Sequence, residues 1–378
     1  MELYLDNAAT TAIDDEVLQD YIKLITAQYG STGSLHQFGQ EPLYLETTSK
    51  EKIAKLLKVK SSEIYFNSGA TEGNNYAIKG VAFNYSNRGK TIITSKVEHP
   101  SVYQCFKQLE KDYGFKCIYL DVDENGVIDL KQLQESLNND VILVSIMYVN
   151  HEVGSIMPIK QISTLLKKYP KVIFHSDITQ AIGKIPVDLS LVDIATMSAH
   201  KIHGIKGSGF LYKKDKVQLY ELISGHHSHN ALRAGTSNWP SNVVMSKALE
   251  KSLKNLSSCY PMLKNSQQKI IEGLSNIEGI TINTNINTCI PGMVNFSVIG
   301  YNPEVIIRAL SNKKIYVSSR SVCSAEKKDT ISSTLYAMKK DIDVCVSSIR
   351  VSFVNPLTDQ EIDYFISSVK EVIDSIRK

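Results

Sequence analysis

Short apolar runs alternate with segments of helical periodicity between about residues 60 and 215. Five apolar runs read as buried strands, at residues 64–66, 91–94, 141–147, 194–197 and 210–212. Glycine and polar residues follow most of these runs, which is typical of the point where a strand ends. The alternation predicts an α/β fold with a mainly parallel central sheet and helices on both faces.

A helical pattern over about residues 243–277 leads into the C-terminal part of the chain. We expect a large domain at residues 14–249, and a smaller α/β domain formed by residues 1–13 and 250–378. With 378 residues, 43% of them hydrophobic, the chain can build both cores. Small and charged residues after position 322 predict a mobile exposed loop at about 318–335, within the smaller domain.

The composition of the chain argues against several classes of function. A net charge of +3 gives no electrostatic reason to expect nucleic acid or a membrane as the main partner. The six cysteines include no CxxC pair, so we expect neither a disulfide framework nor a zinc site, and we expect a reducing, cytoplasmic location. No apolar run reaches about 18 residues, and the N-terminus does not read as a signal peptide. Histidines at 226, 227 and 229 suggest a metal site, but no carboxylate or thiolate lies nearby to complete it.

Lys201 lies in a polar, glycine-rich connection between two of the predicted strands. Desolvation and a neighbouring cation disfavour the ammonium form of such a lysine, and its amine can then form a Schiff base with an aldehyde. A surface lysine on a turn is the alternative. Asp177 ends an apolar run 24 residues earlier, and a carboxylate near a reactive lysine is what a pyridine cofactor needs at its ring nitrogen.

Three further strand ends carry candidate groups. The turn at residues 69–71 combines small residues with a following helical pattern, so backbone amides of Ala70 and Thr71 could hold a phosphate. His99 follows the run at 91–94, where a structural histidine and a ring that stacks on a cofactor are both open. Asn150 follows the run at 141–147. Because open α/β sheets bind ligands at the carboxyl ends of their strands, we expect these residues and Asp177 to share one site.

The Asp177 and Lys201 pair resembles the pyridoxal 5'-phosphate (PLP) enzymes of the aminotransferase-like fold. The motifs around it are similar to those of the cysteine desulfurases that supply sulfur for iron-sulfur clusters and tRNA thiolation: YLDNAATT at residues 4–11, the Gly-Ala-Thr turn at 69–71, and Arg-Ala-Gly-Thr at 233–236. The resemblance runs from Tyr4 to about Asp363. It implies conversion of L-cysteine to L-alanine, with the sulfur passed to an enzyme cysteine and then to an acceptor protein.

The resemblance also implies a role for each matching residue. Lys201 would hold PLP and move the substrate proton, and His99 would stack on the ring and act as acid or base. The other expected PLP ligands are Ala70, Thr71, Asn150, Asp177, Gln180, Ser198 and His200. Thr236 would reach the phosphate of the partner subunit's cofactor, which implies a homodimer. Asn7 would line the substrate site, and Cys323 would form the persulfide.

Arg350 follows both from chemistry and from the resemblance. The planar fork of arginine suits an α-carboxylate, and Arg350 occupies the Arg-x-Ser position of the family. The chain departs from the family at Ser31, Thr32 and Gln40, at His151 in place of a second Asn, in the histidine run, and at Arg320 and Val322 beside the thiol. A PLP-dependent aminotransferase or β-lyase, which would not need Cys323, and a scaffold that kept only the fold therefore remain as alternatives.

Overall fold

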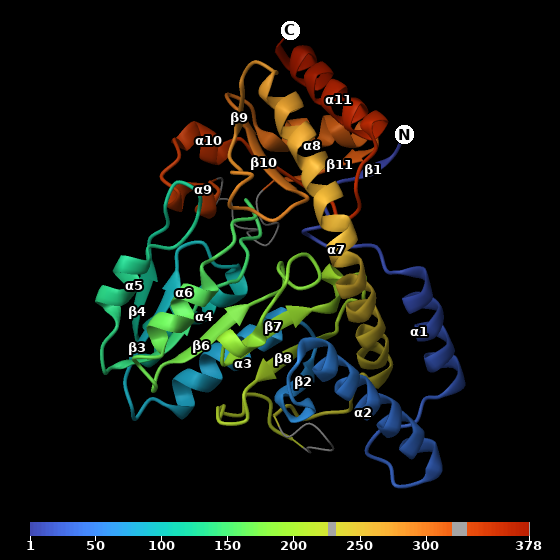
Figure 1. Cartoon of the computed structure of the whole chain (residues 1–378), viewed down its shortest axis with the longest axis vertical. Coiled ribbons are helices and arrows are strands. Elements are labelled where there is room, and N and C mark those ends of the chain that lie inside the picture. Colours follow the sequence, from blue (N-terminus) through green and yellow to red (C-terminus); the bar gives the residue numbers. More distant parts are fainter. Residues whose placement is uncertain (226–231, 320–330, 378) are drawn as a thin grey trace.

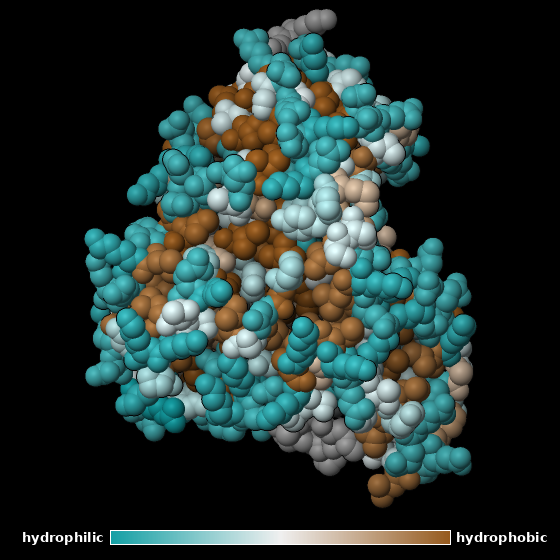
Figure 2. Space-filling view, viewed as in Figure 1, coloured by the Kyte–Doolittle hydropathy of each residue, from teal (hydrophilic) through white to brown (hydrophobic). Residues whose placement is uncertain are grey.

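The computed structural model describes residues 1–225, 232–319 and 331–377. Figure 1 shows two parts stacked along the long axis, one built on a seven-stranded sheet and the other on a four-stranded sheet, with helix α7 (Trp239–Ser275) running from one to the other. In Figure 2 apolar side chains gather at the waist between the parts, whereas polar side chains cover most of both ends. No helix in the described ranges is long and apolar enough to cross a membrane.

The seven-stranded sheet has the order β2-β8-β7-β6-β5-β3-β4. β3, β4, β5, β6 and β7 pair in parallel, while β8 runs antiparallel to both β2 and β7. The prediction of a mainly parallel α/β sheet is thereby confirmed. The strands are β2 (Ile64–Asn67), β3 (Thr91–Ser95), β4 (Lys116–Leu120), β5 (Val141–Ser145), β6 (Ile173–Asp177), β7 (Ile194–Ser198) and β8 (Gly209–Lys213).

Both faces of this sheet are buried, which explains why its strands are continuous apolar runs. Met197 and Phe210 point into a core that includes residues of α2 (Gln37–Leu57), α6 (Ile159–Leu166) and α7. Their neighbours Ile194 and Leu211 point to the opposite face, where α3 (Ala70–Asn84) and α4 (Pro100–Tyr113) pack. The remaining helices of this part are α1 (Asp15–Ala27) and α5 (Leu130–Ser136), with short 3₁₀ turns η1 (Ser61–Glu63), η2 (Leu189–Leu191) and η3 (Ala199–Lys201).

The second sheet is antiparallel, in the order β12-β13-β10-β9. Its strands are β9 (Ile280–Ile282), β10 (Met293–Val298), β12 (Ser318–Ser319) and β13 (Ser348–Ser352). Next to it the N-terminal strand β1 (Leu3–Tyr4) pairs in parallel with β11 (Ile315–Tyr316). The helices here are α8 (Pro303–Asn312), α9 (Ser333–Ala337), α10 (Ile342–Val346) and α11 (Asp359–Arg377).

Helix α7 contributes to both cores. Met245 and Leu249 lie in the core of the large sheet, whereas Ile270 and Leu274 lie in a separate core with Leu3, Phe296 and Phe365. The predicted domain boundary at residues 249/250 thus falls inside one continuous helix. The exact division into domains stays a prediction, although N-terminal residues pack with the C-terminal core as expected.

Candidate active site

The candidate residues gather where the parallel strands end. Asp177 is the last residue of β6, Lys201 ends the 3₁₀ turn that follows β7, and His99 is the N-cap of α4 after β3. Since carboxyl ends of parallel strands meet at one edge of the sheet, these groups come together although about 100 residues separate the first from the last. Figure 1 places this edge toward the four-stranded sheet.

Asp177 is buried and held by two donors. Asn74 Nδ2 donates to Asp177 Oδ2 at 2.8 Å, and the backbone amide of Thr179 donates to Oδ1 at 2.9 Å. Asn74 is itself fixed, because its Nδ2 also contacts Ser101 Oγ at 2.8 Å and its Oδ1 accepts from Thr196 Oγ1. A carboxylate held in place by two donors is what a pyridine cofactor needs beside its ring nitrogen.

The N-terminal segment forms the wall opposite Lys201. Lys201 Nζ donates to the backbone carbonyls of Ala8 and Ala9, and Gln180 Nε2 donates to Ala8 O at 2.9 Å. Asn7 is buried, and its Nδ2 donates to the carbonyls of Tyr4 and Ser352 at 3.1 and 3.2 Å. In this arrangement the Asn7 amide nitrogen fastens the N-terminal segment to β13, and its predicted contact with substrate stays a prediction.

His99 presents a neutral imidazole. Burial lowers its pKa, with a smaller contribution in the same direction from Lys201 and an opposing one from Asp177. Its Nδ1 accepts from the backbone amide of Ser101 at 3.2 Å, so in the neutral ring Nε2 carries the proton. The His99 ring centroid lies 5.3 Å from that of His151 in an edge-on arrangement. A neutral ring that can donate through Nε2 suits both stacking and proton transfer.

A cradle for a phosphate lies at the start of α3. Gly69 has φ +135° and precedes the helix, and the Ala70 amide donates to Ser198 Oγ at 2.7 Å. The next two amides, those of Thr71 and Glu72, precede the first bond of the helix, from Gly73 N to Gly69 O, so they are available to an anion. His200 Nδ1 contacts Thr10 Oγ1 at 3.1 Å, and burial together with nearby lysines, Lys201 foremost, lowers the His200 pKa to about 4.

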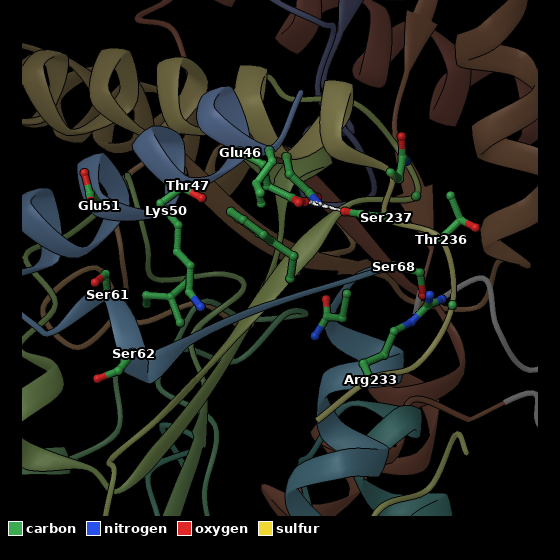
Figure 3. A pocket seen from close by; sticks show the side chains of 18 residues that line it. Glu46, Thr47, Lys50, Glu51, Ser61, Ser62, Ser68, Arg233, Thr236 and Ser237 are labelled. Atoms are coloured by element: carbon green, nitrogen blue, oxygen red, sulfur yellow. Dashed lines mark hydrogen bonds between the residues drawn. The ribbon is translucent and has the colours of Figure 1, made fainter. Parts of the chain in front are cut away.

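Thr236 lies beside this cradle but on the surface. It is exposed and lines a pocket of about 450 Å³ together with Ser68, Gly207 and Arg233 (Figure 3). Ser68 immediately precedes the phosphate turn, and its hydroxyl and amide both donate to Glu72, which also pairs with Arg233 Nε at 3.1 Å. The pocket therefore opens next to the turn at residues 69–71, where Thr236 is available to another molecule.

Arg350 is almost fully buried on β13. Its Nη2 donates to Asp6 Oδ1 at 2.7 Å and its Nη1 to the carbonyl of His151 at 2.8 Å. Its Nε, like His151 Nδ1, is buried and finds no hydrogen-bond partner among the described residues. Nε and Nη2 form the edge of a guanidinium that accepts a carboxylate with two parallel hydrogen bonds, so this edge is half filled by Asp6 and has one donor to spare.

Cys323 lies outside the described residues, as do Arg320, Val322 and the histidines at 226, 227 and 229. The residues that flank the segment 320–330 are described, and both flanks reach the site. Ser318 pairs with Arg350 across β12 and β13, and on the other side Ser332 Oγ donates to Glu152 Oε2 at 2.6 Å. The described residue Ser318 thus lies beside Arg350 in the sheet, and Ser332 contacts Glu152, the neighbour of His151 whose carbonyl Arg350 contacts.

Three of the five described cysteines are poor nucleophiles. Burial is the largest cause that raises the pKa of Cys105 and Cys289 to about 11 and that of Cys117 to about 12, which disfavours the thiolate. No group of three or more His, Cys, Asp or Glu residues within the described ranges could hold a metal ion.

Several residues of the site escaped the sequence-based prediction. In the sequence, Asn74 is one of several polar residues on a predicted helix. Asp6 and Glu152 lie within recognised motifs, but the sequence does not indicate which residues they contact. Lys184, which donates to Gln180 Oε1, follows an apolar turn and carried no signal beyond its charge. Each of these residues contacts a side chain that is either distant in sequence or one turn away. The periodicity of the sequence does not reveal such contacts.

The donor set fits PLP. Lys201 supplies an amine, Asp177 a carboxylate held by two donors, and the start of α3 with Ser198 an anion cradle. The unpartnered Nε of Arg350 suits the carboxylate of an amino acid. Asp177, Lys201 and the start of α3 lie at one edge of the large sheet, and Arg350 comes from β13 of the other sheet, while the individual roles of the site residues stay predictions.

Comparison with known proteins agrees with this chemistry. Residues 3–365 match the family Aminotransferase class-V. A "NifS/IcsS protein homolog" of Lactobacillus delbrueckii subsp. bulgaricus is 38% identical over 100% of this chain and 98% of that protein, and "Cysteine desulfurase IscS" of Dictyoglomus turgidum is 37% identical over 100% and 95%. A solved structure named "NIFS-LIKE PROTEIN" superposes with a TM-score of 0.93 at 36% identity, covering 99% of this chain and 100% of that one. With a family match over nearly its whole length and relatives well above 30% identity, the chain belongs to the class-V aminotransferase family, among the NifS/IscS-type cysteine desulfurases.

Proposed function

We propose that the protein is a PLP-dependent cysteine desulfurase that converts L-cysteine to L-alanine and takes the sulfur onto Cys323. The observation that carries this proposal is the position of Arg350. Its guanidinium has a buried free donor and lies in one site with Lys201 and Asp177. Ser318, before the Cys323 segment, pairs with Arg350 in the sheet, and Ser332, after it, donates to Glu152, the neighbour of His151 whose carbonyl Arg350 contacts. A site that must join an amino acid to a thiol of the enzyme needs this combination.

Arg350 binds the substrate carboxylate through Nε and shares Nη2 with Asp6. The carbonyl of His151 holds Nη1 at 2.8 Å, so the plane of the fork is fixed before substrate arrives. Fixing the carboxylate sets where the Cα and the thiol of the substrate lie, which is the orientation that catalysis requires.

Bound PLP supplies an electron sink for the carbanion that forms at the substrate Cα. Asp177, held by Asn74 and Thr179, would pair with the protonated ring nitrogen, while the start of α3 and Ser198 would hold the phosphate. Lys201 takes the Cα proton and later returns a proton to the substrate. The carbonyls of Ala8 and Ala9 hold its amine at the wall of the site.

Transfer of sulfur needs a thiolate on the enzyme. The Cys323 thiolate attacks the sulfur of bound cysteine, and the new S–S bond forms as the substrate Cβ–S bond breaks. The electron pair of that bond stays with carbon, where a proton completes alanine. His99, with a proton on Nε2, is the nearby donor or acceptor for these proton movements.

Partners and location follow from the same proposal. The exposed Thr236 beside the phosphate turn supports a homodimer in which each subunit contributes to the other's cofactor site. The persulfide would pass its sulfur to an iron-sulfur scaffold protein or a tRNA-thiolation enzyme. Cytoplasmic location stays a prediction.

The test is to incubate the purified protein with L-cysteine and to measure alanine, sulfide and pyruvate together. A desulfurase gives alanine, and mass spectrometry finds one added sulfur on the peptide that contains Cys323. Cys323→Ser should lose sulfur transfer by several orders of magnitude and keep the visible absorbance of bound PLP, because serine oxygen is a poor nucleophile toward sulfur. Cys259→Ser, in α7, is the matched control.

Other outcomes separate the alternatives. Pyruvate as the main product, with Cys323→Ser as active as the parent, would show a β-lyase. A parent protein that stays colourless with added PLP would show a scaffold that kept only the fold.

A further inference from the structure

Gln180 is held at both ends of its side-chain amide. Its Nε2 donates to Ala8 O at 2.9 Å, and its Oε1 accepts from Lys184 Nζ at 2.5 Å. The two ends of a glutamine amide have nearly the same shape, so the partners decide which end points where. The ammonium form of Lys184 has only donors to offer, so this form selects the oxygen end of the amide.

Lys184 is unusual in its surroundings. Many lysines of the protein pair with a carboxylate, as Lys247 does with Asp20 at 2.7 Å. Lys184 instead donates to a neutral amide. The charged groups that act on it are Lys201 and Arg350, and together with burial, which is the largest cause, they lower the Lys184 pKa to about 7. Lys184 in turn is one of the lysines that lower the pKa of His200.

A cationic side chain near two other cations, here Lys201 and Arg350, costs free energy. The position of Lys184 therefore calls for an explanation. Lys184 lies on the turn after β6, four residues beyond Gln180 and seven beyond Asp177. From there its amine donates to Gln180 Oε1. The NH₂ group at the other end of the same amide then points to the carbonyl of Ala8. Lys201 Nζ donates to the same Ala8 carbonyl. The hydrogen bonds thus connect Lys184 with Lys201 through Gln180 and one backbone oxygen.

We propose that Lys184 is a positioning residue, which fixes the Gln180 amide so that its NH₂ group faces the phenolate oxygen of bound PLP. The inference rests on the proposed function, because that oxygen belongs to the cofactor. Gln180 would touch the cofactor, while Lys184 acts only through Gln180 and through its own field at Lys201.

The expected consequence is spectroscopic. A hydrogen bond to the phenolate draws electron density from the conjugated system, so it lowers the pH at which the bound cofactor loses its proton. The field of a nearby cation acts in the same direction. Loss of Lys184 should therefore move the pH midpoint of the visible absorbance upward.

The experiment titrates the visible absorbance of the PLP-loaded protein with pH in the parent and in five variants. Lys184→Met should raise the midpoint by about one pH unit, the usual size for loss of a close polar partner. Gln180→Leu should raise it similarly. In the Gln180→Leu background, Lys184→Met should add less than half of the shift that it causes in the parent, because most of its effect passes through Gln180. Lys184→Arg should restore the parent midpoint, and the exposed Lys160→Met should leave it unchanged.

Two results would overturn the inference. One is an unchanged midpoint in Lys184→Met, and the other is fully additive shifts in the double variant, which would mean that Lys184 does not act through Gln180. If Lys184→Met does not fold, Lys184→Leu takes its place in the same cycle. A parent without visible cofactor absorbance contradicts the proposed function itself, so the two failures are distinguishable.

Discussion

Asn74 offers a sharp test of how the cofactor site is supported. The substitution Asn74→Ala removes a donor 2.8 Å from Asp177 Oδ2 and leaves the Thr196 hydroxyl without its acceptor. A buried hydrogen bond to a charged group contributes about 1.5–3 kcal/mol. With the added loss at Thr196, we expect the free energy of unfolding to fall by about 2–4 kcal/mol. PLP should bind at least ~10-fold more weakly, since ~1.4 kcal/mol is tenfold.

Asn74→Asp makes the test specific to charge. It would set a second carboxyl about 2.8 Å from Asp177. Two negative charges at that distance repel by about 6 kcal/mol at an effective dielectric constant of ~20, so the pair keeps one proton at neutral pH. A proton shared with Asp177 weakens its hold on the ring nitrogen, and we expect kcat to fall by about 100-fold or more, with partial recovery at alkaline pH.

The assays are equilibrium binding of PLP, urea unfolding, and alanine production from cysteine across pH. Asn87→Asp, in an exposed turn after α3, is the matched control and should behave like the parent. If Asn74→Asp binds PLP and turns over cysteine as the parent does at neutral pH, Asp177 is not the partner of the ring nitrogen and our account of the site is wrong.

Three further predictions address other parts of the site. Gly69→Ala places a side chain on a backbone with φ +135° and brings its Cβ to 3.0 Å from Ser198 Oγ. The free energy of unfolding should fall by about 1–3 kcal/mol, and PLP should dissociate at least ~10-fold faster in dialysis. Burial raises the pKa of Glu98 to about 8, so the folded state binds a proton more tightly than the unfolded chain and the stability of the parent should fall as pH rises from about 4.5 to 8, by up to about 5 kcal/mol. Glu98→Gln should flatten that dependence in urea titrations, and an equally steep fall in this variant would rule Glu98 out as its source. Arg350→Lys keeps the charge but loses the fork, so KM for cysteine should rise about 10–100-fold with little change in kcat, and an unchanged KM would mean that the carboxylate binds elsewhere.

The strand ends could be predicted because their chemistry is local. Asp177 ends β6, and His99 and Asn150 come a few residues after the ends of β3 and β5, so parallel pairing alone predicts that they lie at one edge of the sheet. The turn at Gly69 is a weak signal by itself, and the phosphate site is predicted there because the turn precedes a helical pattern and resembles the phosphate-binding turn of the family. At these positions periodicity and side-chain chemistry lead to the same answer.

The supporting contacts could not be predicted for a physical reason. Asp6 pairs with Arg350 across a separation of 344 residues, and Asn74 reaches Asp177 across 103. Such contacts form only when whole layers of secondary structure pack together, and the pattern within a short stretch of sequence does not reveal them. The antiparallel β8 shows the same limit, because a buried strand has the same apolar composition in either direction.

The N-terminal strand has a consequence for how the protein matures. Leu3 pairs with Ile315, and the Ala8 amide donates to Ser352 Oγ, 344 residues later in the chain. At a synthesis rate of about 5–20 residues per second, roughly 17–70 s pass before the ribosome has made the strand on which this segment docks. Until then the segment that carries the Ala8 and Ala9 carbonyls has its contacts with the large part, such as those with Gln180 and Lys201, but not those with β13. A nascent chain can therefore complete its large sheet early, but the site is assembled only after β13 has been made.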